Sequence, residues 1–363
     1  MRRVRAAVVE APGAPFTVRD LELQEPRPDE VLVRMTAAGV CHTDLGMRDT
    51  WPRRLTPMVF GHEGVGRVEA VGAQVRGVAP GDPVCLTFAS CGACEQCATG
   101  HPAYCLHART LNFSGGRADG TTPLARDGTP VHGGFFGQSS FATYAVVRER
   151  GVVPVPADLP DEVAAPLGCS GQTGAGTVLN RLRPEPGASL VVMGAGGVGL
   201  SAVMAAVAVG CDPVVAVDPV PGRRALAVEL GAKTALPPGD GLVEALRDLT
   251  GGGAHHVVET TGRPDVARQA VAALRPRGEL ALVGLGGEVT FDAMHLLAKG
   301  VRVHGVIEGD SRPGRFLPDL IGLWRRGLFP LETLATTFPF EEIGAAVRAM
   351  EGGGVVKPVL LFD

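Results

Sequence analysis

The second half of the chain alternates short apolar runs with amphipathic stretches. Four runs after Pro184 have the length and the Val and Leu content of buried strands, namely SLVVMGAG, PVVAVD, HHVVETTG and ELALVGLG. Helical spacing marks the segments between and after them, GVGLSAVMAAVAVG, RRALAVELG, LVEALRDLTGG and VARQAVAALRPRG. Strands that alternate with helices in this way form parallel sheets, so the pattern predicts a βαβ domain.

The first half has a different pattern. Strand-like runs occur in EVLVRMTAAG and DPVCLTF, without helices regularly placed between them. The segment from Thr110 to Gln138 is rich in glycine and polar residues, so we expect a loop insertion there.

One apolar window is long enough to cross a membrane. No residue from Ser189 to Cys211 is charged. The motif GAGGVG at 194–199 interrupts this window with four glycines, leaving one strand before it and about a dozen helical residues after it. Neither piece could span a bilayer, so we predict a strand, a tight turn and a buried helix.

Composition places the chain among enzyme-sized soluble proteins. Its 363 residues, 45% of them hydrophobic, suffice for two buried domains. A net charge of −4 disfavours a broad phosphate-binding surface, so nucleic acid is not an expected partner. The apolar run AAVV near the N-terminus is too short for a signal-peptide core and is soon followed by Pro12 and Gly13. We therefore expect a cytoplasmic protein.

The glycine motif predicts a dinucleotide site. Gly194, Gly196 and Gly199 form G-x-G-x-x-G between a strand and a helix, where the backbone can approach a pyrophosphate. Asp218 ends the next strand 24 residues after Gly194, close to the spacing of a carboxylate that binds the adenosine ribose. That carboxylate would repel a 2′-phosphate and favours NAD over NADP, although Arg223 and the neighbouring Arg224 leave the preference open.

Four of the eight cysteines form a compact array. They are Cys91, Cys94, Cys97 and Cys105 in CGACEQCATGHPAYC. Four thiolates at this spacing can surround one tetrahedral zinc ion and leave it no open position, so the site would be structural. An iron–sulfur cluster and unliganded thiols are the alternatives.

Three other residues could form a second zinc-binding site. Cys41 follows a strand-like run, and His62 stands in FGHEGVG beside Glu63, between glycines. Cys169 in PLGCSGQTGAG could add a third ligand and leave a fourth zinc position open for water or an alcohol. We expect the two remaining cysteines, Cys85 and Cys211, to be small core residues.

These motifs together resemble the zinc-dependent medium-chain alcohol dehydrogenases. The resemblance rests on GVCHTDLG, GHEGVG, the four-cysteine lobe, LGC-x3-TG, GAGGVG and AVD, in that order. Within this family the chain is most similar to bacterial aryl-alcohol (benzyl alcohol) and geraniol dehydrogenases, through GGFFGQSSFATYAVV and GVIEGDSRPGRFLPDL. The resemblance implies an α/β fold with two domains. A GroES-like β-barrel catalytic domain would comprise residues 1–170 and 308–363, and a Rossmann doubly wound parallel sheet would comprise residues 171–307.

The resemblance also assigns roles to single residues. It implies that Thr43 accepts the alcohol proton and that Asp44 fixes the His62 imidazole. His42 would face the cofactor pyrophosphate in place of an arginine, and Gly46 stands where several relatives carry the histidine that ends the proton relay. By the same resemblance, Cys41, His62, Glu63 and Cys169 would surround the catalytic zinc ion, and the four cysteines of the lobe would hold the structural zinc ion. The expected cofactor contacts are His42, Thr173, Gly194, Gly196, Gly197, Val198, Gly199, Asp218, Arg223, Val283 and Lys357.

The expected function is hydride transfer between NAD and a primary aromatic or allylic alcohol, on two zinc ions per chain. One alternative is a thiol-adduct formaldehyde dehydrogenase that uses mycothiol or glutathione. Another, from a different class, is a zinc-ribbon binding module. The family implies a homodimer or homotetramer and no membrane partner.

Overall fold

The computed structural model describes all 363 residues, which divide into two compact units. The first unit comprises residues 1–169, 312–319 and 331–363, and the second comprises residues 170–311 and 320–330. Helix α11 (Pro313–Arg325) is therefore shared between them. No helix is long and apolar enough to pass through a bilayer.

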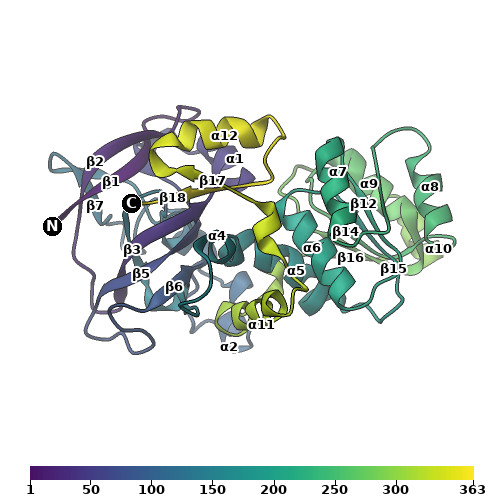
Figure 1. Cartoon of the computed structure of the whole chain (residues 1–363), viewed down its shortest axis with the longest axis horizontal. Helices are drawn as coiled ribbons and strands as arrows, with labels where there is room; N and C mark the ends of the chain where they lie inside the picture. Colours follow the sequence, from purple (N-terminus) through teal and green to yellow (C-terminus); the bar gives the residue numbers. More distant parts are fainter. The chain divides into compact units, whose positions relative to one another are not determined.

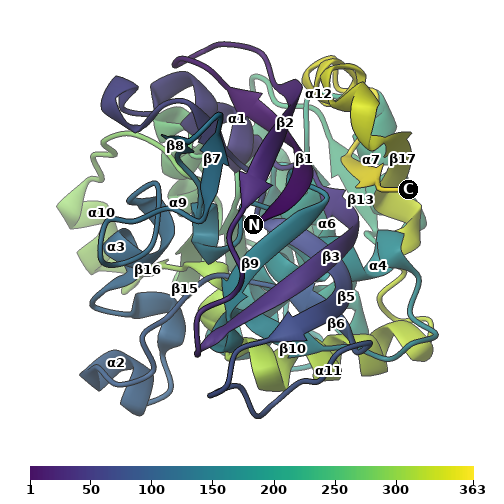
Figure 2. The same cartoon turned by 90° about the vertical axis from the view of Figure 1, so that its left-hand side faces the viewer.

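Two sheets with mainly antiparallel strand pairs form the first unit. One has the order β4-β1-β2-β7-β8, and the other has the order β10-β6-β5-β3-β18-β17 with β9 also paired to β3. Figure 2 shows β9, β3, β5 and β6 of the second sheet side by side. The strands are β1 (Arg2–Val9), β2 (Thr17–Leu23), β3 (Glu30–Gly39), β4 (Met58–Val59), β5 (Glu63–Val71), β6 (Pro83–Leu86), β7 (Leu124–Arg126), β8 (Thr129–Val131), β9 (Tyr144–Arg148), β10 (Val152–Pro154), β17 (Ala335–Pro339) and β18 (Lys357–Leu361). The helices are α1 (His42–Thr50), α2 (Glu95–Ala98), α3 (Ala108–Phe113), α4 (Asp161–Pro166) and α12 (Ile343–Glu351).

Register within the second sheet positions three distant segments. Strand β18 returns from the end of the chain and pairs antiparallel with β3, with Val359 opposite Gly39. On its other side β3 pairs with β5, and there Gly39 lies opposite Glu63. The end of β3 therefore meets the start of β5 and the start of β18.

The segment from Thr110 to Gln138 is not only a loop. Strands β7 and β8 form a hairpin within it, and β7 extends the first sheet by pairing with β2. The loop expectation was wrong there because the backbone groups of this polar segment find partners at a sheet edge.

The second unit is a six-stranded parallel sheet with the order β13-β12-β11-β14-β15-β16. Its strands are β11 (Leu190–Met193), β12 (Val214–Val217), β13 (Thr234–Leu236), β14 (Ala254–Glu259), β15 (Leu274–Leu282) and β16 (Arg302–Gly305). Its helices are α5 (Gln172–Gly176), α6 (Gly197–Ala208), α7 (Pro221–Glu229), α8 (Leu242–Leu249), α9 (Pro264–Ala273) and α10 (Ala293–Lys299). This is the doubly wound order, with helices on both faces (Figure 1), so the predicted Rossmann sheet is confirmed.

One predicted helical stretch ends early. Helix α9 stops at Ala273 and strand β15 begins at Leu274, although the helical pattern continued to Gly278. Pro276 lacks the amide hydrogen that a helix would need and disfavours helical backbone in the residue before it.

Candidate functional site

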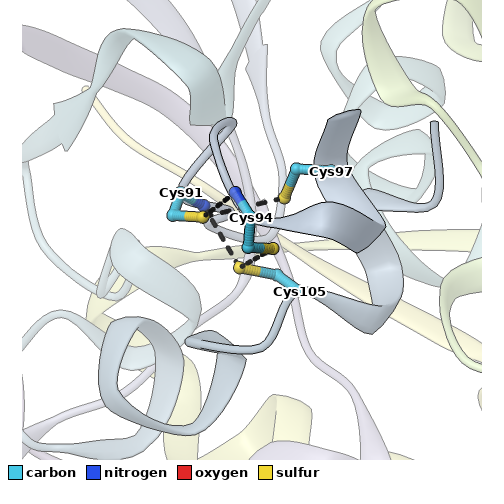
Figure 3. A group of neighbouring side chains, drawn as sticks. All are labelled: Cys91, Cys94, Cys97 and Cys105. Carbon is cyan, nitrogen blue, oxygen red and sulfur yellow. Dashed lines mark hydrogen bonds between the residues drawn. The ribbon is translucent and has the colours of Figure 1, made fainter. Parts of the chain in front are cut away.

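The four cysteines of the lobe converge on one point (Figure 3). Their sulfur atoms all lie within 4.8 Å of one another, with Cys91 Sγ and Cys97 Sγ 3.9 Å apart and Cys94 Sγ and Cys105 Sγ also 3.9 Å apart. The backbone folds around the sulfurs, because the amide of Cys94 donates to Cys91 Sγ at 3.3 Å. The backbone amides of Cys97 and Leu106 lower the pKa of the Cys94 thiol to about 6. Four converging sulfurs fit one zinc ion with a closed shell.

Two arginines brace this lobe from outside. Arg312 donates through Nε to the carbonyl of Gly100 at 2.7 Å and through Nη2 to the carbonyl of Thr99 at 3.1 Å. The guanidinium of Arg150 lies over Gly92, where a Cβ atom would come within 2.0 Å of it. Sequence reasoning missed both residues, since an isolated arginine carries no local signal for such a contact.

The second ligand set also converges. One ligand atom from each of Cys41, His62, Glu63 and Cys169 lies within 4.8 Å of the other three. Cys41 is the N-cap of α1, Glu63 opens β5 and Cys169 follows α4, so segments far apart in the sequence supply the set. A hydrogen bond from Cys169 and the positive charge of Lys357 hold the pKa of Cys41 well below its ordinary value. Thr43 Oγ1 lies 3.7 Å from Cys41 Sγ.

A buried carboxylate orients the His62 ring. Asp44 is fully buried, and its Oδ1 lies 2.9 Å from His62 Nδ1. The same carboxylate accepts from the amides of Gly61 at 3.1 Å and Cys41 at 3.0 Å. Burial alone would lower the pKa of His62, but the Asp44 carboxylate outweighs it and raises that pKa well above the ordinary value.

The remaining nitrogen of this ring points into the ligand set. His62 Nε2 is buried and has no hydrogen-bond partner. Such an orphaned atom is costly unless something binds it. One nitrogen and two sulfurs make the three-ligand set of an open zinc site, and the Glu63 carboxylate lies beside them, so the residues present fit a zinc ion.

Lys357 lies beside this set. Its Nζ is 2.7 Å from Glu63 Oε2 and 3.3 Å from the carbonyl of Val40, and the residue is 3% exposed. Burial would lower the pKa of Lys357, but Glu63 and Cys41 raise it above its ordinary value. Burial raises the pKa of Glu63 despite the lysine. Its expected contact with a pyrophosphate remains a prediction.

An aromatic group covers the imidazole. The ring of Phe136 stacks on His62 with centroids 4.6 Å apart and planes 24° apart, and Phe113 meets Phe136 edge to face at 5.0 Å. Gln138 in the same loop donates to the carbonyl of His62 at 2.9 Å and accepts from the amide of Gly64 at 3.1 Å. Neither Phe136 nor Gln138 was predicted; the glycines of GGFFGQSS are the local signal that could have indicated a turn here.

The glycine motif of the second unit forms the expected tight turn. Gly194 has φ +96°, and a Cβ on Gly199 would lie 1.8 Å from the carbonyl oxygen of Gly194. Gly196 caps helix α6, which begins with Gly197 and Val198. Only glycine allows this turn and this close approach.

Two of the other expected cofactor residues, Asp218 and Val283, directly follow strands of the parallel sheet, and the rest lie on helices. Asp218 follows β12, and its carboxylate accepts from the amides of Ala195 and Val220 at 2.8 Å each. Arg223 lies in helix α7, and Val283 directly follows β15. Thr173 lies in α5, while His42 is the exposed first residue of α1 in the first unit.

Both units match known families. Residues 27–157 match the alcohol dehydrogenase GroES-like domain, and residues 197–321 match the zinc-binding dehydrogenase domain. The chain belongs to the zinc-binding medium-chain alcohol dehydrogenase family and is a zinc-dependent alcohol oxidoreductase. This confirms the predicted family, the GroES-like and Rossmann fold and the enzyme class, and NAD is the cofactor typical of the family.

Individual relatives narrow the comparison. The chain is 49% identical, over 99% of its length and 97% of the relative, to a geraniol dehydrogenase of Castellaniella defragrans. The crystal structure of benzyl alcohol dehydrogenase from Acinetobacter calcoaceticus superposes with a TM-score of 0.96 at 41% identity, covering 100% of both chains. An S-(hydroxymethyl)glutathione dehydrogenase of Haemophilus influenzae is 33% identical over 99% of this chain and 97% of its own. The relatives named for the thiol-adduct reaction are thus less similar to this chain than the geraniol dehydrogenase is, and membership of the family excludes a zinc-ribbon module as the protein's main role.

Proposed function

We propose that this protein oxidises primary alcohols carrying an aromatic or allylic group, with NAD as hydride acceptor. The observation that carries the proposal is the convergence of Cys41, His62 and Cys169 around the orphaned His62 Nε2, beneath the ring of Phe136. Similarity to dehydrogenases named for geraniol and benzyl alcohol supports this substrate class over a thiol adduct.

Each site residue of the first unit would have a distinct role in this mechanism. Cys41, His62 and Cys169 would hold the catalytic zinc, with Glu63 beside it as a second or transient ligand. When bound, that ion acts as a Lewis acid and lowers the pKa of a coordinated alcohol. Thr43 Oγ1 would accept the alcohol proton, and Asp44 keeps His62 Nδ1 protonated so that Nε2 is free to bind metal.

The second unit would bind the cofactor. The amides at Gly196–Val198 open helix α6 and suit a pyrophosphate, and Asp218 suits the adenosine ribose. Arg224 donates to the carbonyl of Asp218 at 2.8 Å, which supports NAD rather than a 2′-phosphorylated nucleotide because that guanidinium already has a backbone partner. Gly46 offers no side chain to end a proton relay, so the proton would leave through water or another group.

We also propose a homodimer or homotetramer that acts in the cytoplasm. Strand β16 is an edge strand, and exposed apolar side chains lie on it and near it, including Val303 (36%), Ile307 (54%) and Leu297 (74%). Such an edge favours pairing with a second copy. All eight cysteines are free, which suits a reducing compartment.

The test is a metal count combined with a substrate panel. We expect about two zinc ions per chain, in line with the two ligand clusters, and NAD-dependent oxidation of benzyl alcohol, cinnamyl alcohol and geraniol without added thiol. The Cys169→Ala variant should keep its fold and one zinc but lose turnover. Activity that requires glutathione or mycothiol would favour the thiol-adduct alternative instead.

A further inference from the structure

The backbone just after β16 is unusual. Three successive residues, Glu308 (φ +49°), Gly309 (φ +63°) and Asp310 (φ +49°), adopt the left-handed conformation. Glycine tolerates it, but a residue with a side chain as long as that of glutamate seldom does. Such strain persists only where the surrounding structure fixes it, and it concentrates at functional sites.

Several contacts hold this turn in place. The carbonyl of Gly309 accepts from Asn180 Nδ2 at 3.0 Å, and a Cβ atom on Gly309 would lie 2.2 Å from the carbonyl oxygen of Gln172. Asp310 pairs with Arg181 at 3.7 Å. The turn is therefore held against helix α5 and the segment Thr177–Leu182 that follows it, and it cannot relax without losing these contacts.

The conformation directs a carboxylate into the second unit. Glu308 is 7% exposed, and its Oε2 accepts from Gln172 Nε2 at 3.2 Å and from Thr173 Oγ1 at 3.4 Å. The amide of Gln172 is itself fixed, since its Oε1 accepts from Ser311 Oγ at 2.7 Å. Two groups that donate to the same oxygen suit an ionised carboxylate, which can only accept.

Topology places this carboxylate in one half of the dinucleotide site. In a doubly wound sheet the dinucleotide lies across the carboxyl ends of the strands, with one mononucleotide on each half. Asp218 follows β12 and marks the adenosine half, so the nicotinamide belongs to the half formed by β14, β15 and β16. Glu308 follows the end of β16 by three residues.

Helix α5 links the carboxylate to the cofactor turn. A Cβ atom on Gly174 would lie 2.0 Å from the carbonyl oxygen of Val198, so the residue after Thr173 touches the start of helix α6. Thr173 thus contacts the Glu308 carboxylate and directly precedes the residue that packs against Val198. A nicotinamide packed on Thr173 would have this anion one side chain away.

We propose that Glu308 shifts the relative affinity of the enzyme toward the oxidised nicotinamide and away from the reduced one. The ring of NAD⁺ carries a positive charge, which disappears when the ring accepts a hydride. A buried carboxylate beside the ring therefore stabilises bound NAD⁺ and gives bound NADH no such stabilisation, so it lowers the Kd for NAD⁺ relative to the Kd for NADH. The inference rests on the NAD-dependent function proposed above.

The test compares the affinities for the two cofactor forms. In Glu308→Gln, which keeps the shape and an acceptor oxygen, the ratio Kd(NAD⁺)/Kd(NADH) should rise about fivefold to fiftyfold, as expected when one of two neighbouring opposite charges is removed at an effective dielectric constant of about 20 to 40. If Glu308 has a purely structural role, the substitution should weaken the binding of NAD⁺ and of NADH equally and leave the ratio of the two Kd values unchanged. Tryptophan fluorescence or calorimetry on the zinc-loaded full chain gives both constants without turnover.

Two further variants make the result decisive. Glu308→Gly removes the charge and suits the left-handed backbone, so it should shift the ratio in the same direction even if Glu308→Gln folds poorly. Glu279→Gln is the matched control, because this similarly covered carboxylate (13% exposed) lies within β15 and pairs with His304 at 3.1 Å. It should leave the ratio unchanged.

The outcomes separate this inference from the proposed function. Binding of both forms to the wild type, with an unchanged ratio in both Glu308 variants, overturns the role of Glu308 and leaves the proposed function intact. An equal shift in the Glu279 control also overturns that role. A wild-type protein that binds neither form would overturn the proposed function and this inference together.

Discussion

The ring of Phe136 stacks on the imidazole of His62, and Phe136 does so from a left-handed backbone conformation (φ +50°). The turn is held by neighbours, since the amide of Gln138 donates to the carbonyl of Phe135 at 3.0 Å and Ser139 Oγ donates to the carbonyl of Val59 at 2.6 Å. The molecule thus keeps an unfavourable backbone in order to place one aromatic ring over a candidate metal ligand.

Substituting Phe136 by alanine and by glycine separates the contribution of the aromatic ring from the cost of the left-handed backbone. Phe136→Ala removes the ring and keeps the strain, whereas Phe136→Gly removes both. We expect the glycine variant to have the larger free energy of unfolding, by about 1 kcal/mol, measured by urea denaturation. Both variants should release zinc faster to a chromophoric chelator than the wild type. An alanine variant as stable as the glycine variant would contradict the left-handed assignment.

Replacing Asp44 by Asn should loosen the metal site. The Asp44 carboxylate accepts from two amides and from His62, and an asparagine must turn its NH₂ group toward one of these donors. We expect a loss of about 2–4 kcal/mol in the free energy of unfolding and a zinc affinity lower by about 10–100-fold. Chelator competition measures the second effect. Asp49→Asn, on the exposed part of the same helix, is the control and should change neither quantity.

Lys357→Met should leave the Glu63 carboxylate buried without its cation. We expect a loss of about 3–5 kcal/mol in the free energy of unfolding, as for other broken buried ion pairs. The double variant Lys357→Met with Glu63→Gln should recover much of it, because no uncompensated charge remains. A double-mutant cycle by chemical denaturation checks this, and strictly additive losses would show that the pair is not coupled.

The affinity for NADH should depend on pH through His42. If this residue contacts the pyrophosphate, its imidazolium attracts the phosphates below the histidine pKa and the neutral ring does not above it. Binding should therefore weaken as the pH rises from 6 to 8.5. In His42→Arg the pH dependence should disappear, because a guanidinium stays charged. Equal wild-type affinity at both pH values would remove His42 from the cofactor site.

Losing one ligand of the cysteine lobe should affect stability more than the chemistry. Cys97→Ser is expected to leave about one zinc per chain and to lower the melting temperature by several degrees, because structural zinc contributes directly to folding. Cys169→Ala should also leave one zinc but lose turnover with little change in melting temperature. Metal analysis and calorimetry on both variants distinguish a closed site from an open one.

The sequence by itself determined the parts whose signal is local. The alternation of strands and helices after Pro184 fixed the Rossmann sheet, since each βαβ unit has its own periodicity. The cysteine lobe was equally evident, because its four ligands lie within 15 residues and a short turn suffices to bring their sulfurs together. The order of the motifs then indicated the family.

Only the tertiary structure decided which distant side chains meet. Lys357 and Glu63 are 294 residues apart and touch because β18 and β5 both pair with the end of β3. The stacking of Phe136 on His62 and the buried turn at Glu308 likewise depend on a left-handed backbone conformation. In residues other than glycine, the residue type does not indicate this conformation. Register and strain of this kind arise from the packing of whole elements, so no local pattern in the sequence encodes them.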